Sequence, residues 1–360
     1  MHSLRIGNTS ELHIGYQYLQ QPEFWEQAIE GPSALLISGK GVPAIWSESV
    51  ISALRQLDKK WDHHVLPDQE TDKTLTNIQP IFDTLVEGQY ARDTTLIALG
   101  GGVVGDMTGF TAACYQRGVS WINLPTTLLS QADACIGGKT GVNHPQGKNM
   151  IGAFHHPTKV LTDVATLSTL PQRQLRAGLA EIIKHAVIAD IDLLDWLERK
   201  LPAFLQQEPA ELEEAVFRSC SIKARIVERD QREKGERALL NFGHTFGHAI
   251  EAHQKYSGLL HGEAVSIGMA MALQMSYTLE NLNTTDGDRV LNLLERAGLP
   301  ISPAATSMRP EDFLIGMAKD KKILADHMRL ILCPALGHAT IRAVDIDQQL
   351  QPFLQRYLNT

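Results

Sequence analysis

Three histidines lie close together in the second half of the sequence. His244 and His248 are four residues apart in the segment LNFGHTFGHAIE, and His261 follows in LHGE. Side chains four residues apart share one face of a helix, so spacing alone favours His244 and His248 as joint metal ligands. Core packing and proton transfer are the other roles open to these histidines. The spacing does not decide among the three.

A buried carboxylate is the natural complement to two imidazoles. The segment GLAEIIKHAV places Glu181 and Lys184 three residues apart among apolar residues, on one face of a predicted helix. Buried charges require partners. One glutamate and two histidines form a common zinc ligand set, with a fourth position open to water or a substrate oxygen. The sequence therefore predicts a metal site that includes Glu181.

A glycine-rich turn marks a second candidate site. In LIALGGGVVGDMTGF, Gly100, Gly102 and Gly105 fit the pattern GxGxxG between a predicted strand and a predicted helix. Such a turn lets the backbone and the helix N-terminus approach a pyrophosphate. A plain tight turn is the alternative, because the loop lies near residue 100 and no acidic residue follows about 20 positions later. The segment LPDQETDK, which is either a ribose-contacting or a solvated loop, offers Asp68, Glu70 and Lys73.

Cations without nearby acids predict an anion site in the middle of the chain. The segment ADACIGGKTGVNHPQGKNMIGAFHHP contains Lys139, Lys148 and Asn149 among glycines, and no Asp or Glu lies between Asp133 and Asp163. Lysines in loops can converge on a phosphate or a carboxylate. A flexible surface loop with unrelated lysines is the alternative.

Composition limits the classes of partner. The 360 residues are 43% hydrophobic and 21% charged, with a formal net charge of -8, which argues against nucleic acid or an anionic membrane surface as main partner. The four cysteines, Cys114, Cys135, Cys220 and Cys333, show no CxxC spacing and predict reduced thiols. The N-terminus lacks an apolar signal region, and no apolar stretch reaches the ~18 residues of a membrane span. We expect a cytoplasmic protein.

The hydrophobic pattern changes near residue 170. Before it, β-rich runs at 33–38, 94–100 and 119–125 alternate with helical patterns, which is typical of a parallel sheet. After it, helical periodicity dominates. We predict an α/β Rossmann-like NAD-binding domain over residues 1–170 and an all-α metal- and substrate-binding domain over residues 171–360. The space between two such domains is the usual place for a ligand.

The motifs together resemble those of the 3-dehydroquinate synthase family of sugar-phosphate cyclases. They run from about residue 66 to 332: GGGVVGDMTGF, YQRG, PTTLLSQADACIGGKTGVNHPQGKNMIGAF, LPQRQLRAGLAEIIKHAV, ERALLNFGHTFGHAIEA, LHGEAV and KDKKIL. The family is similar in fold to glycerol dehydrogenase and the iron-containing alcohol dehydrogenases. The resemblance therefore implies an N-terminal NAD domain and a C-terminal helical metal domain.

The resemblance also implies a reaction, the second step of the shikimate pathway to aromatic amino acids. The family converts 3-deoxy-D-arabino-heptulosonate 7-phosphate into 3-dehydroquinate and phosphate. Transient oxidation by NAD at C5, with zinc or cobalt polarising the alcohol, acidifies the C6 hydrogen, and phosphate is eliminated. The bound NADH then returns its hydride, and ring opening is followed by an intramolecular aldol closure.

The resemblance assigns roles to particular residues. Zinc is held by Glu181, His244 and His261, while His248 stays off the metal as a proton carrier near the phosphate. Contacts to phosphate are implied for Lys139, Asn149, Asn241, His248 and one lysine of KDKK, taken as Lys321 rather than Lys319 or Lys322. Lys223 and Arg237 match carboxylate-binding positions, Lys148 and Lys184 lie around the hydroxyls, and Asp133 lies between nicotinamide and substrate. Arg117 resembles an arginine that reaches a neighbouring subunit's site, which implies a homodimer.

The resemblance also implies a set of contacts to NAD: Glu70, Lys73, Gly101, Gly102, Val103, Asp106, Thr126, Thr127, Lys139, Lys148 and Thr169. We add Asp68, which lies in LPDQETDK, the charged loop of residues 66–73. The first sixty residues match the family only loosely. No acid follows the SALLISGK strand, which leaves Ser38 or Lys40 at the adenosine end of NAD. Three alternative functions remain. The first is a sister cyclase that makes a valiolone, a deoxyinosose or an amino analogue. The others are an NAD-linked polyol dehydrogenase and a catalytically inactive ligand-binding protein on this fold.

Overall fold

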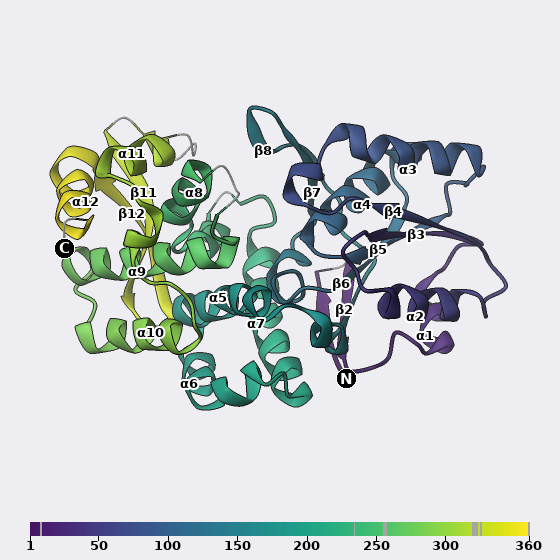
Figure 1. The fold of residues 1–360 in the computed structure, drawn as a ribbon, viewed down its shortest axis with the longest axis horizontal. Coiled ribbons are helices and arrows are strands. Elements are labelled where there is room, and N and C mark those ends of the chain that lie inside the picture. Colours follow the sequence, from purple (N-terminus) through teal and green to yellow (C-terminus); the bar gives the residue numbers. More distant parts are fainter. Residues whose placement is uncertain (8, 234, 255–257, 319–322, 325, 359–360) are drawn as a thin grey trace. The chain divides into compact units, whose positions relative to one another are not determined.

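The computed structural model describes residues 1–360 apart from 8, 234, 255–257, 319–322, 325 and 359–360. The chain divides into two compact units, one of residues 1–171 with 207–228 and one of residues 172–206 with 229–360. Within the described residues, every helix is too short or too polar to span a bilayer. Figure 1 shows the elements of both units.

The first unit is built on a seven-stranded sheet in the order β1-β2-β9-β6-β5-β3-β4. β1 pairs with β2 antiparallel, and all other pairs are parallel. The strands are β1 (His2–Ile6), β2 (Ser10–Gly15), β3 (Ser33–Gly39), β4 (Lys60–Leu66), β5 (Thr95–Gly100), β6 (Ser120–Pro125) and β9 (Lys159–Asp163). The three strands expected from β-rich runs are β3, β5 and β6, so the predicted parallel α/β sheet is confirmed.

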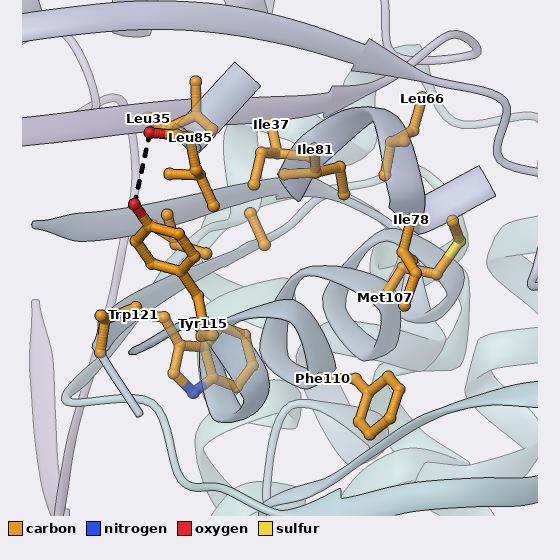
Figure 2. Packing of buried hydrophobic residues seen from close by; sticks show 14 of the residues in the cluster. Leu35, Ile37, Leu66, Ile78, Ile81, Leu85, Met107, Phe110, Tyr115 and Trp121 are labelled. Atoms are coloured by element: carbon orange, nitrogen blue, oxygen red, sulfur yellow. Dashed lines mark hydrogen bonds between the residues drawn. The ribbon is translucent and has the colours of Figure 1, made fainter. Parts of the chain in front are cut away.

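Helices cover both faces of this sheet because its central strands are apolar on both sides. They are α1 (Pro22–Ala28), α2 (Ala44–Leu54), α3 (Leu75–Glu87) and α4 (Gly102–Cys114). Leu35 and Ile37 of β3 pack in one core with residues of α3 and α4, as Figure 2 shows. Ala34 and Leu36, which alternate with them, pack in a second core with residues of α1 and α2.

The cation-rich segment is a β-hairpin rather than the predicted loop. It pairs β7 (Lys139–His144) with β8 (Gly147–Phe154), with a register shift between Val142 and His144. Close backbone contact explains two of its glycines, because a Cβ on Gly141 would lie 2.5 Å from the Ile151 carbonyl oxygen and one on Gly152 would lie 2.3 Å from that of Thr140. The glycines that favoured a loop therefore permit the pairing of two strands.

The second unit packs around two helices. α5 (Gln172–Ala189) is buried along most of its length, and α9 (His261–Leu279) is buried on nearly all sides. A Cβ on Gly262, at the start of α9, would lie 1.8 Å from the Ala177 carbonyl oxygen of α5. Only a glycine permits this approach. The other helices are α6 (Ile191–Leu205), α8 (His244–His253), α10 (Thr284–Arg296), α11 (Pro310–Ala318) and α12 (Gln351–Leu358).

The two units differ in two features from the predicted domains of residues 1–170 and 171–360. The second unit also contains a three-stranded antiparallel sheet of β10 (Ile323–Leu324), β11 (His327–Ala335) and β12 (His338–Asp345), so it is predominantly helical rather than all-α. Most of α7 (Pro209–Arg229) belongs to the first unit. Its Ser219 hydroxyl donates to the Ala132 carbonyl oxygen at 3.1 Å, and the Cys220 thiol donates to that of Gln131 at 3.1 Å.

Candidate functional site

Glu181 and Lys184 lie on buried turns of α5. Their exposed fractions are 0% and 1%, and Lys184 Nζ lies 2.5 Å from Glu181 Oε2. Helical spacing of three residues brings the two side chains together, as the sequence predicted. The ammonium offsets part of the cost of burying the carboxylate. The second oxygen of Glu181 faces two histidines.

Glu181, His244 and His261 bring three donor atoms together. His244 Nε2 lies 3.6 Å and His261 Nε2 lies 3.5 Å from Glu181 Oε1, and one donor atom from each residue lies within 4.8 Å of the others. Ligand atoms about 2.1 Å from a tetrahedral ion are about 3.4 Å apart. The spacing and the chemistry of the three donors therefore fit a divalent metal ion.

His248 is not a member of this three-residue set. Its ring lies edge-on to that of His244, with 5.3 Å between ring centroids, and 6.2 Å from the His261 ring. The joint ligation by His244 and His248 that spacing alone favoured is therefore not the arrangement in the structure. His261 supplies the third donor.

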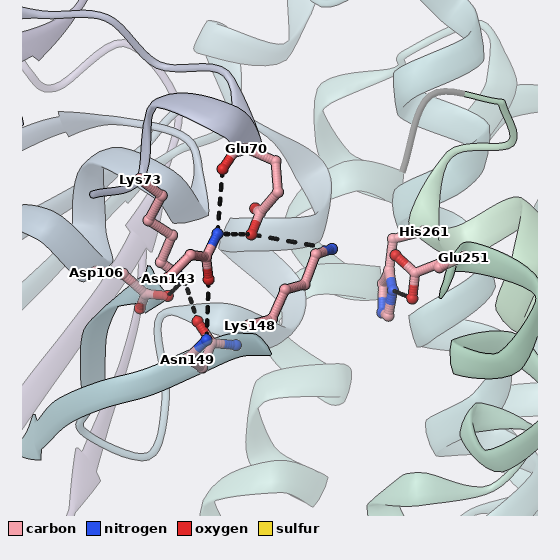
Figure 3. Close-up of polar contacts among 8 residues, drawn as sticks. All are labelled: Glu70, Lys73, Asp106, Asn143, Lys148, Asn149, Glu251 and His261. Carbon is pink, nitrogen blue, oxygen red and sulfur yellow. Dashed lines mark hydrogen bonds and ion pairs between the residues drawn. The ribbon is translucent and has the colours of Figure 1, made fainter. Parts of the chain in front are cut away.

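The far nitrogen of each imidazole faces a hydrogen-bond acceptor. His244 Nδ1 lies 3.1 Å from the Phe242 carbonyl oxygen, and His261 Nδ1 lies 3.1 Å from Glu251 Oε2; Figure 3 shows the second pair. A carbonyl oxygen only accepts, so Nδ1 of His244 donates and Nε2 keeps its lone pair when the ring is neutral. Both rings turn Nε2 toward Glu181 and Nδ1 toward an acceptor, and metal-binding histidines pair their other ring nitrogen with an acceptor in this way.

Electrostatics favour a neutral ring at His244 and a positive charge at His261. Burial lowers the pKa of His244 well below its ordinary value, since the opposing Glu181 charge is countered by Lys184 and the neighbouring histidines. Burial also lowers the pKa of His261, but hydrogen bonds to Glu181 and Glu251 outweigh it and raise the pKa to about 10. The carboxylates around His261 thus attract positive charge.

The glycine turn joins β5 to α4 in the first unit. A Cβ on Gly100 would lie 2.6 Å from Val104 Cγ2, so a larger residue does not fit there. The Thr126 amide donates to the Gly100 carbonyl oxygen at 2.9 Å, and Thr127 Oγ1 accepts from the Ser130 amide at 3.2 Å. Gly101 is the N-cap of α4, and Gly102 and Val103 form its first turn. A small hollow in this unit is lined by residues that include Gly102, Asp106, Ser130 and Lys139.

A polar network lies beside the turn in the first unit. The buried Lys73 ammonium contacts the Asp106 carboxylate and lies 2.5 Å from Asn149 Oδ1. Burial raises the pKa of Asp106, and the Lys73 charge offsets this only in part. The Asn143 amide nitrogen donates to Glu70 Oε1 at 2.8 Å, while its oxygen accepts from the Asn149 backbone amide at 2.9 Å. Figure 3 shows these contacts.

Asn143 is an organising residue that the sequence analysis missed. Its side chain joins the charged loop to β8, where Asn149 adopts the left-handed φ of 54°. Lys148 Nζ lies 3.9 Å from Glu70 Oε1. The signal was present, because Asn143 lies between Lys139 and Lys148 in the segment singled out for its lysines.

Lys223 and Asp133 meet within the first unit. Lys223 Nζ lies 2.7 Å from Asp133 Oδ1 and also donates to the Asp133 carbonyl oxygen at 2.7 Å. Asp133 belongs to a π-helical turn, Ser130–Ala134, and Lys223 extends from α7. The two residues are close in space although 90 positions separate them in sequence.

Other predicted residues have separate surroundings in the first unit. Thr169 Oγ1 accepts from the Trp46 indole at 2.7 Å. Asp68 Oδ2 accepts from the Gly41 amide at 3.0 Å. Ser38 pairs with His63 at 2.7 Å, and the exposed Lys40 uses its backbone amide to donate to Leu66. Lys139 and Arg117 are exposed, and Arg117 has a φ of 66°.

Arg237 and Asn241 lie in a short 3-10 helix of the second unit, Glu236–Asn241. The Arg237 guanidinium is buried and donates to the Gln231 carbonyl oxygen at 2.7 Å. The Asn241 amide nitrogen donates to Glu233 Oε1 at 2.9 Å. Lys321, with Lys319 and Lys322, lies outside the described residues.

Family models and individual relatives of this chain carry the same description. Family models described as 3-dehydroquinate synthase N-terminal and C-terminal match residues 63–177 and 178–323. A 3-dehydroquinate synthase of Teredinibacter turnerae is 50% identical over 340 residues, covering 94% of each chain. One of Azotobacter vinelandii is 50% identical over 343 residues, covering 95% of this chain and 93% of the relative.

Solved structures of sister enzymes share the fold. A 2-deoxy-scyllo-inosose synthase with carbaglucose-6-phosphate, NAD+ and Co2+ matches with a TM-score of 0.90 and 25% identity over 99% of this chain and 100% of that chain. A 2-epi-5-epi-valiolone synthase from Streptomyces hygroscopicus with NAD+ and Zn2+ matches with a TM-score of 0.88 and 26% identity over 100% and 99%. A glycerol dehydrogenase from Schizosaccharomyces pombe, at 16% identity and a TM-score of 0.67 over 98% and 89%, shares the fold alone.

Proposed function

The chain belongs to the 3-dehydroquinate synthase family, and from this premise we propose that it converts 3-deoxy-D-arabino-heptulosonate 7-phosphate into 3-dehydroquinate and phosphate. The observation that carries the proposal is the 50% identity to 3-dehydroquinate synthases over 94% of the chain. The sister cyclases match at 25–26% identity, which favours the dehydroquinate reaction over theirs. A polyol dehydrogenase shares the fold but not this level of identity.

Glu181, His244 and His261 hold a divalent metal ion, zinc or cobalt, in this proposal. Their spacing supports it, and the Co2+ and Zn2+ bound by two sister enzymes agree with it. When bound, the ion supplies Lewis-acid polarisation of the hydroxyl to be oxidised. Lys184, buried against Glu181, limits the negative charge around the ligand set and can donate to a substrate hydroxyl.

NAD binds at the glycine turn of the first unit in this proposal, and it supplies a hydride acceptor that is restored within each turnover. The amide groups of Gly101, Gly102 and Val103 at the start of α4 favour the pyrophosphate. Thr126 and Thr127 follow the neighbouring strand β6, while Glu70, Lys73 and Asp106 form the polar network beside the turn. Asp68 and Thr169 are the remaining proposed contacts.

The substrate carries a carboxylate and a phosphate, and the chain must supply cations for both. We assign Lys223 and Arg237 to the carboxylate, and Lys139, Asn149, Asn241, His248 and Lys321 to the phosphate. Lys148 and Asp133 contact hydroxyls. In support, the segment between Asp133 and Asp163 has three lysines and no acid, which suits an anion in a protein of net charge -8. His248, outside the ligand set, stays available to carry a proton.

We further infer a cytoplasmic homodimer in which Arg117 contributes to the neighbouring subunit's phosphate site. Support comes from the exposure of Arg117 on the turn after α4, where the residue adopts a left-handed φ of 66°. The four cysteines are unpaired thiols, as is usual in a reducing compartment.

The function is tested by incubating the purified protein with the heptulosonate phosphate, NAD and zinc while phosphate, product and NADH absorbance are followed together. We expect phosphate and 3-dehydroquinate in equal amounts, without accumulation of NADH. Stoichiometric NADH without phosphate would identify a simple dehydrogenase instead. A phosphorylated sugar that lacks a carboxylate, tested in parallel, separates a sister cyclase from a dehydroquinate synthase, since Lys223 and Arg237 are assigned to that carboxylate.

A further inference from the structure

His261 is the first residue of α9, and its position depends on contacts outside the three-donor set. Its Nε2 points toward Glu181, while its Nδ1 lies 3.1 Å from Glu251 Oε2. Glu251 is buried, with 8% of its surface exposed. A buried carboxylate requires strong partners, and the contact drawn in Figure 3 joins it directly to the histidine ring.

Glu251 and His244 share one face of α8. They are seven positions apart in the sequence, which is close to two full helical turns, so their side chains point the same way. One helix therefore supplies a donor to the proposed metal ion through His244 and a hydrogen-bond acceptor to a second donor, His261. The ring of His261 lies between Glu181 of α5 and Glu251 of α8.

An imidazole has two nitrogens, and only one of them can face the metal. Rotation of the ring about its Cβ–Cγ bond would replace Nδ1 by Cδ2 and Nε2 by Cε1, and a neutral ring can carry its proton on either nitrogen. When the ring is neutral, as it must be to bind a metal ion, a carboxylate facing Nδ1 selects the tautomer with the proton at Nδ1 and leaves the Nε2 lone pair toward Glu181. Such a partner also makes the imidazole a better electron donor.

We propose that Glu251 is a positioning residue of the metal centre, which orients His261 and fixes its tautomer through the hydrogen bond to Nδ1. The inference rests on the proposed metal ligation by Glu181, His244 and His261, and it adds a fourth side chain on which that ligation depends. Phe242 serves His244 in the same way through its backbone carbonyl oxygen. Substitution cannot remove the backbone carbonyl of Phe242, but it can remove the carboxylate of Glu251, so the role of Glu251 can be tested.

The test measures the metal itself rather than turnover. Wild type, Glu251→Ala and Glu251→Gln are stripped with a chelator and titrated with Co2+, and both the dissociation constant and the visible absorption of the bound cobalt are recorded. Glu198→Gln is the matched control, because Glu198 is also a paired carboxylate of the second unit but contacts Arg289. Circular dichroism and thermal unfolding of the stripped proteins show whether each variant folds.

We expect Glu251→Ala to weaken Co2+ binding about 10- to 100-fold and to change the cobalt spectrum. Glu251→Gln should lose less, because its amide oxygen still accepts from Nδ1, and Glu198→Gln should match wild type. If Glu251→Ala does not fold, Glu251→Gln and Glu251→Asp decide, and the shorter aspartate should bind more weakly than glutamine.

Three results would overturn the inference. Unchanged affinity and spectrum in the Glu251 variants would leave the metal site in place and remove only the role of Glu251. Equal weakening in Glu198→Gln would show a general loss of stability. Absence of Co2+ binding by wild type would refute the metal centre itself and the inference with it.

Discussion

At the scale of single residues, the candidate metal centre divides three histidines between two roles. His244 and His261 present Nε2 to one oxygen of Glu181, and their Nδ1 atoms face Phe242 and Glu251. His248 lies on the same helix as His244 but outside this donor set. A histidine committed to a metal cannot exchange a proton near neutral pH, whereas one outside the set can.

This division predicts the effect of replacing His248. In His248→Ala, phosphate release should fall about a hundredfold or more, the usual contribution of an acid or base group, while Co2+ affinity should stay within about threefold of wild type because the donor set is intact. Single-turnover phosphate release and Co2+ titration measure the two quantities separately. Loss of the metal with normal phosphate release would reverse the roles.

A pair of histidines in the first unit predicts a pH-dependent stability. Burial lowers the pKa of His63, and the neighbouring His64 lowers it further; burial also lowers the pKa of His64. The unfolded chain therefore binds protons first as the pH falls below about 6.5, and the free energy of unfolding decreases from there until the folded pKa is passed. In His63→Asn this decrease should be smaller between pH 7 and pH 5, by only a fraction of the limiting ~1.4 kcal/mol for each pH unit, because His63 is exposed and solvent screens its surroundings.

Urea unfolding of both proteins across this pH range gives the comparison. The variant also loses the hydrogen bond between His63 and Ser38. This loss lowers its free energy of unfolding, so the comparison uses the slope of each stability curve and not its height. Parallel stability curves for the wild type and the variant would show that His63 does not titrate differently on unfolding.

At the scale of elements, the contact between α5 and α9 sets the distance from Glu181 to His261. Gly262 lies against the backbone of α5 at Ala177, one helical turn before Glu181. Arg173 of α5 donates to both oxygens of Glu263, each at 2.7 Å, and Glu263 also accepts from the Leu260 amide at 2.7 Å. The start of α9 is thereby held on both sides of His261.

Gly262→Ala should disrupt this contact. The new Cβ would lie 1.8 Å from the Ala177 carbonyl oxygen, so the helices must separate, and we expect a loss of about 3 kcal/mol in the free energy of unfolding together with weaker Co2+ binding. Gly102→Ala is the matched control, because a Cβ at the start of α4 would lie 3.8 Å from Ala134 Cβ. The control should change stability by less than about 1 kcal/mol. Normal stability and metal affinity in Gly262→Ala would contradict this account.

Elements were predictable where their pattern is local. The alternation of β3, β5 and β6 with helices, and the periodicity of α5 and α9, are visible in the sequence because each depends on neighbouring residues. The hairpin β7–β8 was missed, since its glycines resemble those of a loop and reveal their function only when the strands pair. β11 and β12, joined at Gly337 with its φ of 78°, carried a strand pattern that helical periodicity nearby obscured.

The sequence predicted which residues belong to the candidate site better than it predicted which of them contact one another. Spacing identified His244, His248 and His261 as a group, but the choice of His261 depends on the long-range contact of Gly262 with α5. Asn143 lay within the segment singled out for its lysines, but its partners Glu70 and Asn149 appear only in the fold. Glu251, in the role proposed for it, supports another side chain, and no spacing rule identifies such a residue. Periodicity also cannot show which unit a helix joins. α7 is helical as expected, but it was predicted to belong to the domain of residues 171–360, and most of it belongs to the first unit.

At the scale of the whole molecule, each unit carries one part of the proposed chemistry on its own scaffold. The first has the glycine turn, the Lys73 network and the Lys223–Asp133 pair. The second has the three donors and their supporting acceptors. The reaction requires both parts, so loss of the metal should abolish catalysis while the fold of the first unit persists.

Metal content is the measurement that tests the central claim most directly. Wild type, Glu181→Ala, His244→Ala and His261→Ala are dialysed against zinc and analysed for bound metal per chain, with His253→Ala, the exposed last residue of α8, as control. We predict about one zinc per chain in wild type and in His253→Ala, and a loss of at least tenfold in affinity in each of the other three. Full zinc occupancy in any of those three variants would contradict the assignment of the metal centre.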